Sequence, residues 1–426
     1  MDNIRFYNNL VLGLILIGST LATPTLAGGG AGLAAALYTT LSNHPALNGK
    51  QAEVYAKGYV AESARALRYP SLTGQLSSND KNVDGSSIQV RQPLWAFGRI
   101  DSTIAHADAD TDTEKSDLLR IKRQLIEQTA VAYTRVLGVR ESMNVAVDNM
   151  ASFELLHQQI KHREVGQRAS VADVKLAWAR LLQAQAKKNK LKGDLLIAEN
   201  ELLALTQTPV GTDQIVPKAL TQLPTTTQIL ALAMAQSADV SLKAQRIVLA
   251  HADVEREKSA SMPTIYLQAD HYNNDNQQPN SDTTLSITLA ATIDGFGFAA
   301  TGRNNAAGAR LQAAKADLYT TQNEVRRLVN GHAANRDAQH ILIGSQEVSV
   351  QALKEILASY QRQYSAGLKT WLDVLNIQRE LTEQRLQLVQ ADNDWLIYTL
   401  KLAALTGSLD ALAGVPEKPN REPNND

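Results

Sequence analysis

The sequence of 426 residues predicts a mainly α-helical protein with a smaller β component. Three observations predict this fold class. Apolar residues repeat every seven positions along unusually long stretches, two pairs of short segments alternate polar and apolar residues, and one order of patterns occurs in both halves of the chain. The chain is therefore predicted to be a duplicated unit of long coiled-coil helices that carries four strands.

The N-terminus has the three parts of a signal peptide, which we place at residues 1–27. Arg5 supplies a short basic region, an apolar run follows from Leu10 to Ile17, and small residues precede the expected cleavage after Ala27. The apolar run is too short to span a bilayer well, so a retained membrane anchor is the less favoured alternative. The pattern predicts export from the cytoplasm.

Short sequence pairs recur in the same order in both halves, which indicates internal duplication. We place the first repeat at residues 28–210 and the second at 226–410, joined by a Thr- and Pro-rich connector at 211–225. Residues 411–426 are predicted to be a disordered tail. The recurring pairs are Pro70-Ser71-Leu72 with Pro263-Thr264-Ile265, Gly98-Arg99 with Gly302-Arg303, Ala172-Asp173-Val174 with Leu372-Asp373-Val374, and Leu205-Thr206 with Leu405-Thr406.

Each repeat contains two alternating segments separated by a polar loop. In the first repeat a strand is predicted at 69–77, a loop at 78–86, and a second strand from Ile88. In the second repeat a strand starts at Ile265, and a loop at 272–282 leads to the next. Alternating segments of about ten residues are typical of membrane-barrel strands, although two soluble hairpins would give the same pattern. Aromatic residues gather near the strand ends, as in the girdles of such barrels: Tyr69, Trp95, Phe97, Tyr266, Phe296 and Phe298.

The helices carry the strongest pattern. A strict seven-residue repeat is the seam of a left-handed coiled coil. The run from Ile100 to His162 would span about 90 Å as one helix at about 1.5 Å per residue, far beyond a typical globular helix. The first repeat has the row Leu118, Leu125, Ala132, Val139, Ala146, Phe153 and Ile160, and then Val174, Leu181, Lys188, Leu195 and Leu202, which Lys188 interrupts. The second has Ile343, Val350, Leu357 and Tyr364, and then Val374, Leu381, Leu388, Trp395 and Leu402.

The strand number predicts an oligomer. Four strands cannot close a barrel, and an open sheet cannot lie in lipid because the backbone groups at its edges would lack hydrogen-bond partners. Three chains would supply twelve strands, an even number that closes. We therefore predict a homotrimer in which a 12-stranded membrane β-barrel continues as a tube of coiled-coil helices, an α-barrel.

Composition and motifs argue against several other functions. The net charge of -1 gives no electrostatic case for nucleic-acid binding. The chain has no cysteine, which excludes disulfides, thiol catalysis, cysteine-ligated metals and a lipidated cysteine. The sequence also lacks a His-Glu-x-x-His motif, a Walker A motif and a Gly-x-Ser-x-Gly elbow. We therefore expect no enzyme activity, no cofactor and no metal site.

The arrangement resembles the TolC family of outer-membrane efflux and secretion channels. The resemblance covers nearly the whole mature chain, and three stretches carry it: Gln92-Pro93-Leu94-Trp95 with Phe97-Gly98-Arg99, residues 166–174 (GQRASVADV), and residues 364–376 (YSAGLKTWLDVLN). The family implies a trimer in the outer membrane that extends into the periplasm, with the connector in an equatorial belt. It also implies a closed periplasmic tip that opens when an adaptor protein and an inner-membrane pump, an ABC transporter or another type, dock. Substrate passes through without chemistry.

The resemblance also assigns roles at the tip. Asp373 matches a lumen-facing aspartate whose three copies form a constriction, and Asn376 occupies the family's second acidic position. Asp173, Tyr364 and Lys369 match positions that tie neighbouring helix pairs together, with Lys369 in place of a family arginine. The alternative for both aspartates is simple capping of the helices that follow them.

Two glycines are assigned to the turns between the paired helices. Gly166 and Gly367 are expected to let the chain reverse direction. The first turn has one more residue between Gly166 and Asp173 than the second has between Gly367 and Asp373, which leaves the facing of Asp173 open.

These observations predict a passive export conduit of the outer membrane. The missing lipidation cysteine and the GQRASVADV stretch favour type I secretion of a protein such as an adhesin. The outer-membrane channel of a tripartite multidrug efflux pump is the alternative of the same class. A periplasmic coiled-coil adaptor is the alternative of a different class, although an adaptor would normally contain one helical hairpin rather than a duplicated unit.

Overall fold

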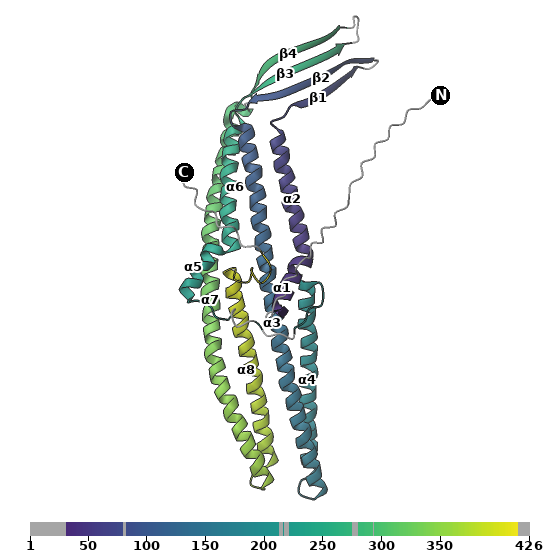
Figure 1. Cartoon of the computed structure of the whole chain (residues 1–426), viewed down its shortest axis with the longest axis vertical. Helices are drawn as coiled ribbons and strands as arrows, with labels where there is room; N and C mark the ends of the chain where they lie inside the picture. The colour runs from purple at the N-terminus through teal and green to yellow at the C-terminus, as the bar shows by residue number, and fades with distance from the viewer. Residues whose placement is uncertain are drawn as a thin grey trace, which may run out of the picture.

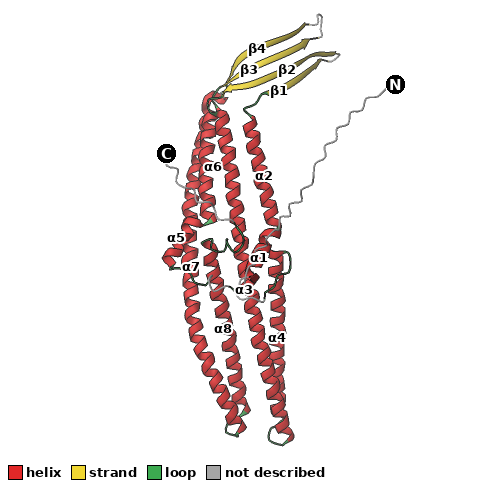
Figure 2. Cartoon of the chain, viewed as in Figure 1, coloured by secondary structure: helices red, strands yellow, loops and turns green. Residues whose placement is uncertain are grey.

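The computed structural model describes residues 31–79, 82–212, 216, 221–274, 280–292 and 294–415. The predicted signal peptide at 1–27 and residues 416–426 of the predicted tail lie outside these ranges. The described chain is a bundle of long helices with one sheet at its end (Figures 1 and 2). Its elements are α1 (Ala31–Asn43), α2 (Pro45–Ala66), β1 (Ser71–Asn79), β2 (Asn82–Trp95), α3 (Arg99–Val165), α4 (Val171–Thr206), α5 (Thr226–Gln236), α6 (Ala238–Ala260), β3 (Thr264–Asn274), β4 (Asn280–Ala290), η2 (Asp294–Gly297), α7 (Phe298–Ser365) and α8 (Trp371–Leu405).

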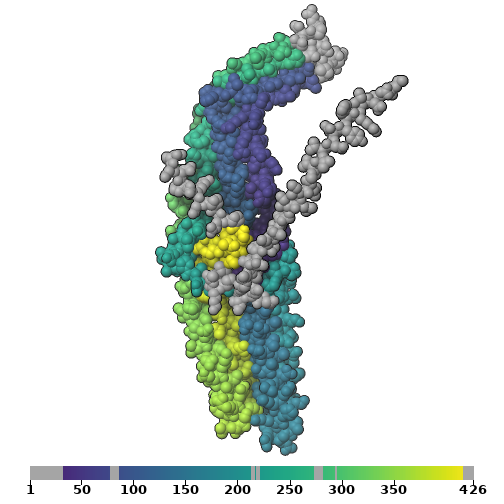
Figure 3. Space-filling model, in the orientation of Figure 1, coloured from purple at the N-terminus to yellow at the C-terminus, as the bar shows by residue number. Residues whose placement is uncertain are grey.

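Two helices run through most of the bundle. α3 has 67 residues and α7 has 68, so each spans about 100 Å at about 1.5 Å per residue. α2 and α6 accompany their upper halves, while α4 and α8 fold back along their lower halves as antiparallel hairpins (Figure 1). The order α2, β1, β2, α3, α4 repeats as α6, β3, β4, α7, α8, which confirms the duplicated architecture. The space-filling view shows an elongated body from whose upper end the sheet bends away (Figure 3).

The four strands form one antiparallel sheet in the order β1-β2-β3-β4. The strands are longer than predicted, because β1 and β2 continue through most of the stretch assigned to the loop at 78–86. Polar residues do not prevent strand pairing when the backbone groups of the partner strand are in register. Part of the second predicted loop, residues 275–279, lies outside the described residues.

The heptad rows form the helical core, as predicted. Phe153 and Ile160 of α3 lie with Tyr364 and Val374 in one apolar cluster near the hairpin turns. In α4 the more deeply buried row is shifted by three residues from the predicted one and consists mainly of alanines: Ala177, Ala184, Leu191 and Ala198. The prediction favoured larger side chains, whereas small residues allow the closest approach of α4 to α3.

The two hairpins of the chain meet along α3 and α8. Asn149 of α3 accepts a hydrogen bond of 2.7 Å from the Thr382 hydroxyl and a longer one of 3.4 Å from the Gln378 amide. The α3 residue next to it, Asp148, forms an ion pair of 2.9 Å with Arg385. These contacts hold both hairpins of one chain side by side.

The largest apolar cluster lies at mid-height, where α1, α3, α4 and α8 converge. Tyr133 and Leu400 are fully buried there, and so is Leu409 in the turns that follow α8. The predicted disordered tail is wrong for residues 411–415, because Ala413 and Val415 pack against this cluster. Asp410 anchors the segment through an ion pair of 2.7 Å with Arg123 of α3.

Candidate functional site

The sheet is amphipathic. Its register places Leu72 of β1 opposite Val90 of β2, and Leu267 of β3 opposite Ile287 of β4, on one face. Residues on this face are strongly exposed, with Leu72 at 73% and Ile287 at 72%. The alternation predicted from the sequence is therefore present, and its apolar face is left uncovered by the described chain.

The opposite face of the sheet is polar. Asp270 of β3 accepts hydrogen bonds of 2.7 Å from the side-chain amides of Gln89 and Gln268. Arg91 and Ser286 lie on the same face, since they are paired in register with Gln268. Within the described residues, no helix is both long and apolar enough to cross a membrane.

Aromatic side chains surround the junction between strands and helices. Trp95 and Phe97 are exposed and meet edge to face, with ring centroids 6.1 Å apart. Phe296 and Phe298 occupy the corresponding passage in the second repeat and are also exposed, as is Tyr69 before β1. Such rings have an apolar body and suit the boundary between hydrocarbon and water.

The hairpin turns at the other end of the bundle have the same length and the same hydrogen bonds. The amide of Arg168 donates to the Arg163 carbonyl, and the amide of Leu368 donates to the Gln363 carbonyl. Gln167, at φ 55°, and Gly367, at φ 78°, hold the left-handed position of each turn. Gly166, to which the sequence assigned this role, has an ordinary φ of -82°. Aligning Gln167 with Gly367 removes the apparent extra residue, so Asp173 and Asp373 are structurally equivalent.

Both aspartates cap the helices that follow them. Asp173 accepts from the backbone amide and the hydroxyl of Ser170, and Asp373 accepts from the same groups of Thr370, at distances of 2.8–2.9 Å. These hydrogen bonds lower the pKa of both carboxyl groups. The capping alternative is thus realised in both hairpins, and each cap uses a single carboxylate oxygen, Oδ2.

The remaining oxygen of each aspartate has a different environment. Oδ1 of Asp173 accepts a hydrogen bond of 3.0 Å from the indole nitrogen of Trp371, which links α4 to α8. Oδ1 of Asp373 has no hydrogen-bond partner among the described residues. Asn376, one turn further along α8, is exposed. Asp373 therefore retains a carboxylate oxygen that is available to solvent.

The side chains of Tyr364 and Lys369 both contact other residues of the same chain. The Arg163 guanidinium of α3 lies 3.9 Å from the Tyr364 ring centroid, and its nitrogen donates to the Tyr364 carbonyl at 3.4 Å. Burial raises the pKa of Tyr364. Lys369 lies 4.5 Å over the ring of Tyr360, in its own hairpin. The structure thus brings Asp173 and Tyr364 to the contact between hairpins, together with Arg163 and Trp371, which no pattern in the sequence singles out.

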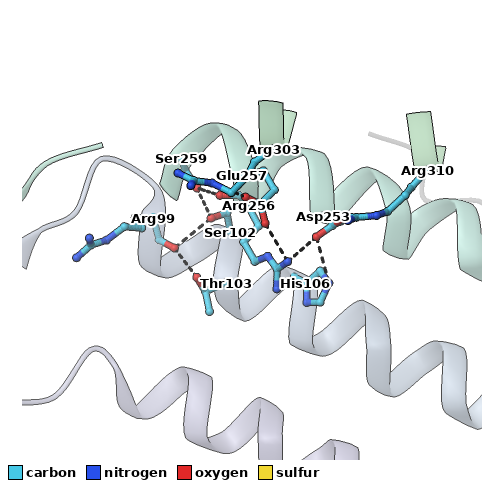
Figure 4. Close-up of polar contacts among 10 residues, drawn as sticks. All are labelled: Arg99, Ser102, Thr103, His106, Asp253, Arg256, Glu257, Ser259, Arg303 and Arg310. Carbon is cyan, nitrogen blue, oxygen red and sulfur yellow. Dashed lines mark hydrogen bonds and ion pairs between the residues drawn. The ribbon is translucent and has the colours of Figure 1, made fainter. Parts of the chain in front are cut away.

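A second polar cluster lies just below the strands (Figure 4). Asp253 of α6 is only 8% exposed and pairs with Arg256 at 2.6 Å and with Arg310 of α7 at 3.2 Å. His106 of α3 approaches the same carboxylate at 3.8 Å. Burial lowers the pKa of His106, and the Arg256 guanidinium acts in the same direction. The cluster joins three helices, and no spacing in the sequence predicts it, because its members come from distant segments.

No group of three or more possible metal ligands occurs among the described residues. The amphipathic sheet with its exposed apolar face, attached to long helical hairpins, is the arrangement of a protein that contacts a membrane at one end.

A family model described as outer membrane efflux protein matches residues 36–207 and 229–408, and the chain belongs to this family. The chain is 24% identical over 423 residues to the outer membrane efflux protein BepC of Brucella suis biovar 1 (strain 1330), with 94% of this chain and 89% of BepC covered. It is 23% identical over 357 residues to the alkaline protease secretion protein AprF of Pseudomonas aeruginosa, covering 78% and 71%. A solved structure of CusC matches with a TM-score of 0.77 at 17% identity, over 88% of this chain and 92% of CusC.

These findings confirm the resemblance to the TolC family and the predicted fold class. The two matched segments of the family model correspond to the two repeats. The chain is an outer-membrane protein of the efflux and secretion channel family, and its helices extend into the periplasm.

Proposed function

We propose that three copies of this chain form one passive channel-tunnel through the outer membrane and into the periplasm. The observation that carries this proposal is the amphipathic sheet. Its outer strands, β1 and β4, each leave one edge unpaired within the described chain, and unpaired edges are not tolerated in lipid. Pairing β4 of one copy with β1 of the next would remove every edge and close twelve strands into a barrel.

In this assembly the two faces of the sheet would meet different solvents. The face with Leu72, Val90 and Ile287 would contact lipid, and the face with Arg91 and Asp270 would line an aqueous lumen. The exposed rings of Trp95 and Phe296 would lie at the membrane boundary. The helical hairpins would continue the lumen into the periplasm.

At the periplasmic end we propose that Asp373 and Asn376 form the constriction. Three Asp373 carboxylates around one axis would attract cations and resist anions. The hydrogen bonds from Thr370, and then the Lys369 ammonium, lower the pKa of Asp373, so the ring would be charged at neutral pH. Asn376 in the next ring would make this throat less negative than one with two acidic rings.

We propose that the cargo is a protein exported by a type I secretion complex, with a periplasmic adaptor and an inner-membrane ABC pump as partners. The similarity to AprF, an alkaline protease secretion protein, supports this assignment, as does the absence of a cysteine for lipidation. Multidrug efflux is the second candidate, because BepC, an efflux protein, matches a larger share of the chain. The family assignment leaves the adaptor alternative without support.

The pore and its throat can be tested by single-channel conductance of the purified protein in planar bilayers. Wild type should give a small, cation-preferring current. Asp373→Asn should weaken the preference, and the reciprocal Asn376→Asp should strengthen it. A folded protein that conducts nothing would refute the channel, whereas current with unchanged selectivity in both variants would refute only the throat.

The cargo requires a separate experiment. A deletion strain should lose a large protein from its culture medium while its susceptibility to drugs and dyes stays the same. If drug susceptibility rises several-fold and the exported proteins are unchanged, efflux becomes the assigned function.

A further inference from the structure

A pocket of about 240 Å³ lies where α2 and α3 meet the sheet (Figure 1). It is lined by Arg68, which follows α2, by residues 93–98 at the passage from β2 to α3, and by Ile100 and Asp101 in the first turn of α3. Sites for drug-sized ligands usually have volumes of roughly 300–1,000 Å³. This pocket is smaller and therefore has room for one small polar group but not for a whole lipid.

One wall of the pocket belongs to the apolar face of the sheet. The register of β2 with β3 shifts between Pro93 and Trp95, so Trp95 lies opposite Ile265. Ile265 in turn pairs with Leu289 of β4 on the apolar face. The other walls belong to the helical end of the molecule. With the apolar face in lipid, the pocket lies at the border between hydrocarbon and water, which is the level of the lipid headgroups.

Two opposite charges lie side by side in this pocket. The Arg68 guanidinium donates to Oδ1 of Asp101 at 2.7 Å, and the two side chains are 61% and 71% exposed. The side-chain amide of Gln92 donates to the Arg68 carbonyl at 2.9 Å and holds the segment after α2 against β2. A guanidinium has five N–H donors, and Oδ2 of Asp101 has no hydrogen-bond partner among the described residues. Both charged groups can therefore bind a further group without losing their mutual contact.

The second repeat forms the same passage without these charges. Phe97 and Phe296 lie two residues before α3 and α7 in the same left-handed conformation, at φ 48° and 54°. The third residue of α7 is Ala300 instead of an aspartate, and Ser261 and Met262 follow α6 where a leucine and an arginine follow α2. An exposed ion pair also adds little to the stability of a fold. The passage from strand to helix therefore does not require the ion pair, and binding of a ligand accounts for it better.

We propose that this pocket binds the headgroup of a phospholipid that carries both a phosphate and a primary ammonium group, as phosphatidylethanolamine does. The phosphate binds the Arg68 guanidinium, and the ammonium binds Asp101 and the face of the Trp95 ring. The acyl chains continue from Trp95 along the apolar face of the sheet. This inference rests on the proposed placement of the sheet in lipid.

The two charges select among lipid headgroups. Phosphatidylglycerol has a phosphate but no cation, so its headgroup leaves Asp101 as a like charge beside the phosphate. The trimethylammonium group of phosphatidylcholine has no N–H to donate to Asp101. One exposed charge pair corresponds to a preference of about two- to fivefold for phosphatidylethanolamine over either of the other lipids.

Quenching of Trp95 fluorescence by brominated lipids measures this preference. The purified protein is reconstituted in bilayers of all three lipids, with one of them brominated at a time. The other tryptophans lie in α4 and α8, away from the sheet, and a Trp95→Phe variant gives their background. In wild type, brominated phosphatidylethanolamine should bind next to Trp95 about two- to fivefold more strongly than the other two lipids.

Two variants and one control assign the preference to the pocket. Asp101→Asn should abolish the preference for phosphatidylethanolamine, and Arg68→Gln should weaken the binding of all three lipids next to Trp95. The matched control is Lys258→Gln, which breaks another exposed ion pair, with Glu255 near the end of α6, and should keep the wild-type preference.

The outcomes separate the pocket from the channel. Equal quenching by all three lipids in wild type would overturn the proposal, and so would a preference for phosphatidylglycerol or a preference that survives in Asp101→Asn. If no brominated lipid quenches Trp95 at all, the placement of the sheet in lipid is wrong, and the proposed channel function fails with it.

Discussion

Gly138 of α3 faces Asn393 of α8 at a point where the two helices leave no room for a side chain. A Cβ atom at position 138 would overlap Oδ1 of Asn393 and would lie 2.5 Å from its Cγ and 2.9 Å from its Cβ. Carbon atoms in contact are normally about 3.5–4.0 Å apart. Rotation of the Asn393 side chain can move the first two atoms but not its Cβ, so Gly138→Ala must push α3 and α8 apart.

Two opposing energies set the size of the effect. Replacing glycine by alanine inside a helix favours folding by about 1 kcal/mol. Overpacking a close contact costs about 1–3 kcal/mol. Gly193 of α4 provides the matched control, since a Cβ there meets nothing within 4 Å in the chain. Gly193→Ala should therefore stabilise by about 1 kcal/mol, and Gly138→Ala should be less stable than Gly193→Ala by about 1–3 kcal/mol per chain.

Thermal unfolding of the purified protein in detergent, followed by circular dichroism, would compare the two variants with wild type. Asn393→Ala should partly rescue Gly138→Ala, because it removes the two closest atoms and leaves only Cβ. If Gly138→Ala is stabilised as much as Gly193→Ala, the helices are not in close contact at this point and the reasoning is refuted.

Three further predictions concern the sheet, the tip and the junction. Ile287→Lys should cost about 2–4 kcal/mol and reduce heat-resistant oligomers in the outer membrane, while the neighbouring Thr288→Lys, on the polar face, should not. Gln167→Gly should raise the melting temperature, because glycine adopts the left-handed backbone conformation of this position without the steric strain of a side chain. An unchanged melting temperature would show that the turn tolerates glutamine without strain. The pKa of His106 is lower in the folded chain than in the unfolded chain. As pH drops below about 6.5, the unfolded chain therefore takes up a proton at His106 more readily than the folded chain, and the free energy of unfolding should fall. A His106→Gln variant should flatten this part of the stability–pH curve, and an unchanged curve would assign the loss to other groups.

The sequence predicted the helices and strands because their periodicity records which face is buried. Phe153 and Ile160 are buried as the heptads required, and the large apolar residues of β4 share one face of the sheet. Errors arose where a different property decides the structure. The α4 seam uses alanines such as Ala184, which a search for large apolar residues overlooks. The ordered segment around Ala413 depends on a core built by four distant helices.

The tip was harder to predict than the fold. The resemblance identified the right positions, but the glycine pattern suggested turns of unequal length, because Gln167 adopts the conformation that glycine usually supplies. Which group binds Asp173 could not be read from the sequence, since both Tyr364 and Trp371 lie near it. Only the relative placement of α4 and α8 shows that the indole, and not the phenol, points at the carboxylate.

Duplication explains how one motif can serve two purposes at this tip. Both hairpins use the same capping box, and each cap needs one oxygen of its aspartate. The first helical residue differs, being Trp371 in α8 and Val171 in α4, and valine has no side-chain donor. The spare oxygen of Asp173 is therefore bound within the chain by Trp371, and that of Asp373 has no hydrogen-bond partner among the described residues. Removing either carboxylate should cost a similar amount of helix stability, so conductance and ion selectivity, rather than unfolding, must distinguish the roles of the two aspartates at the tip.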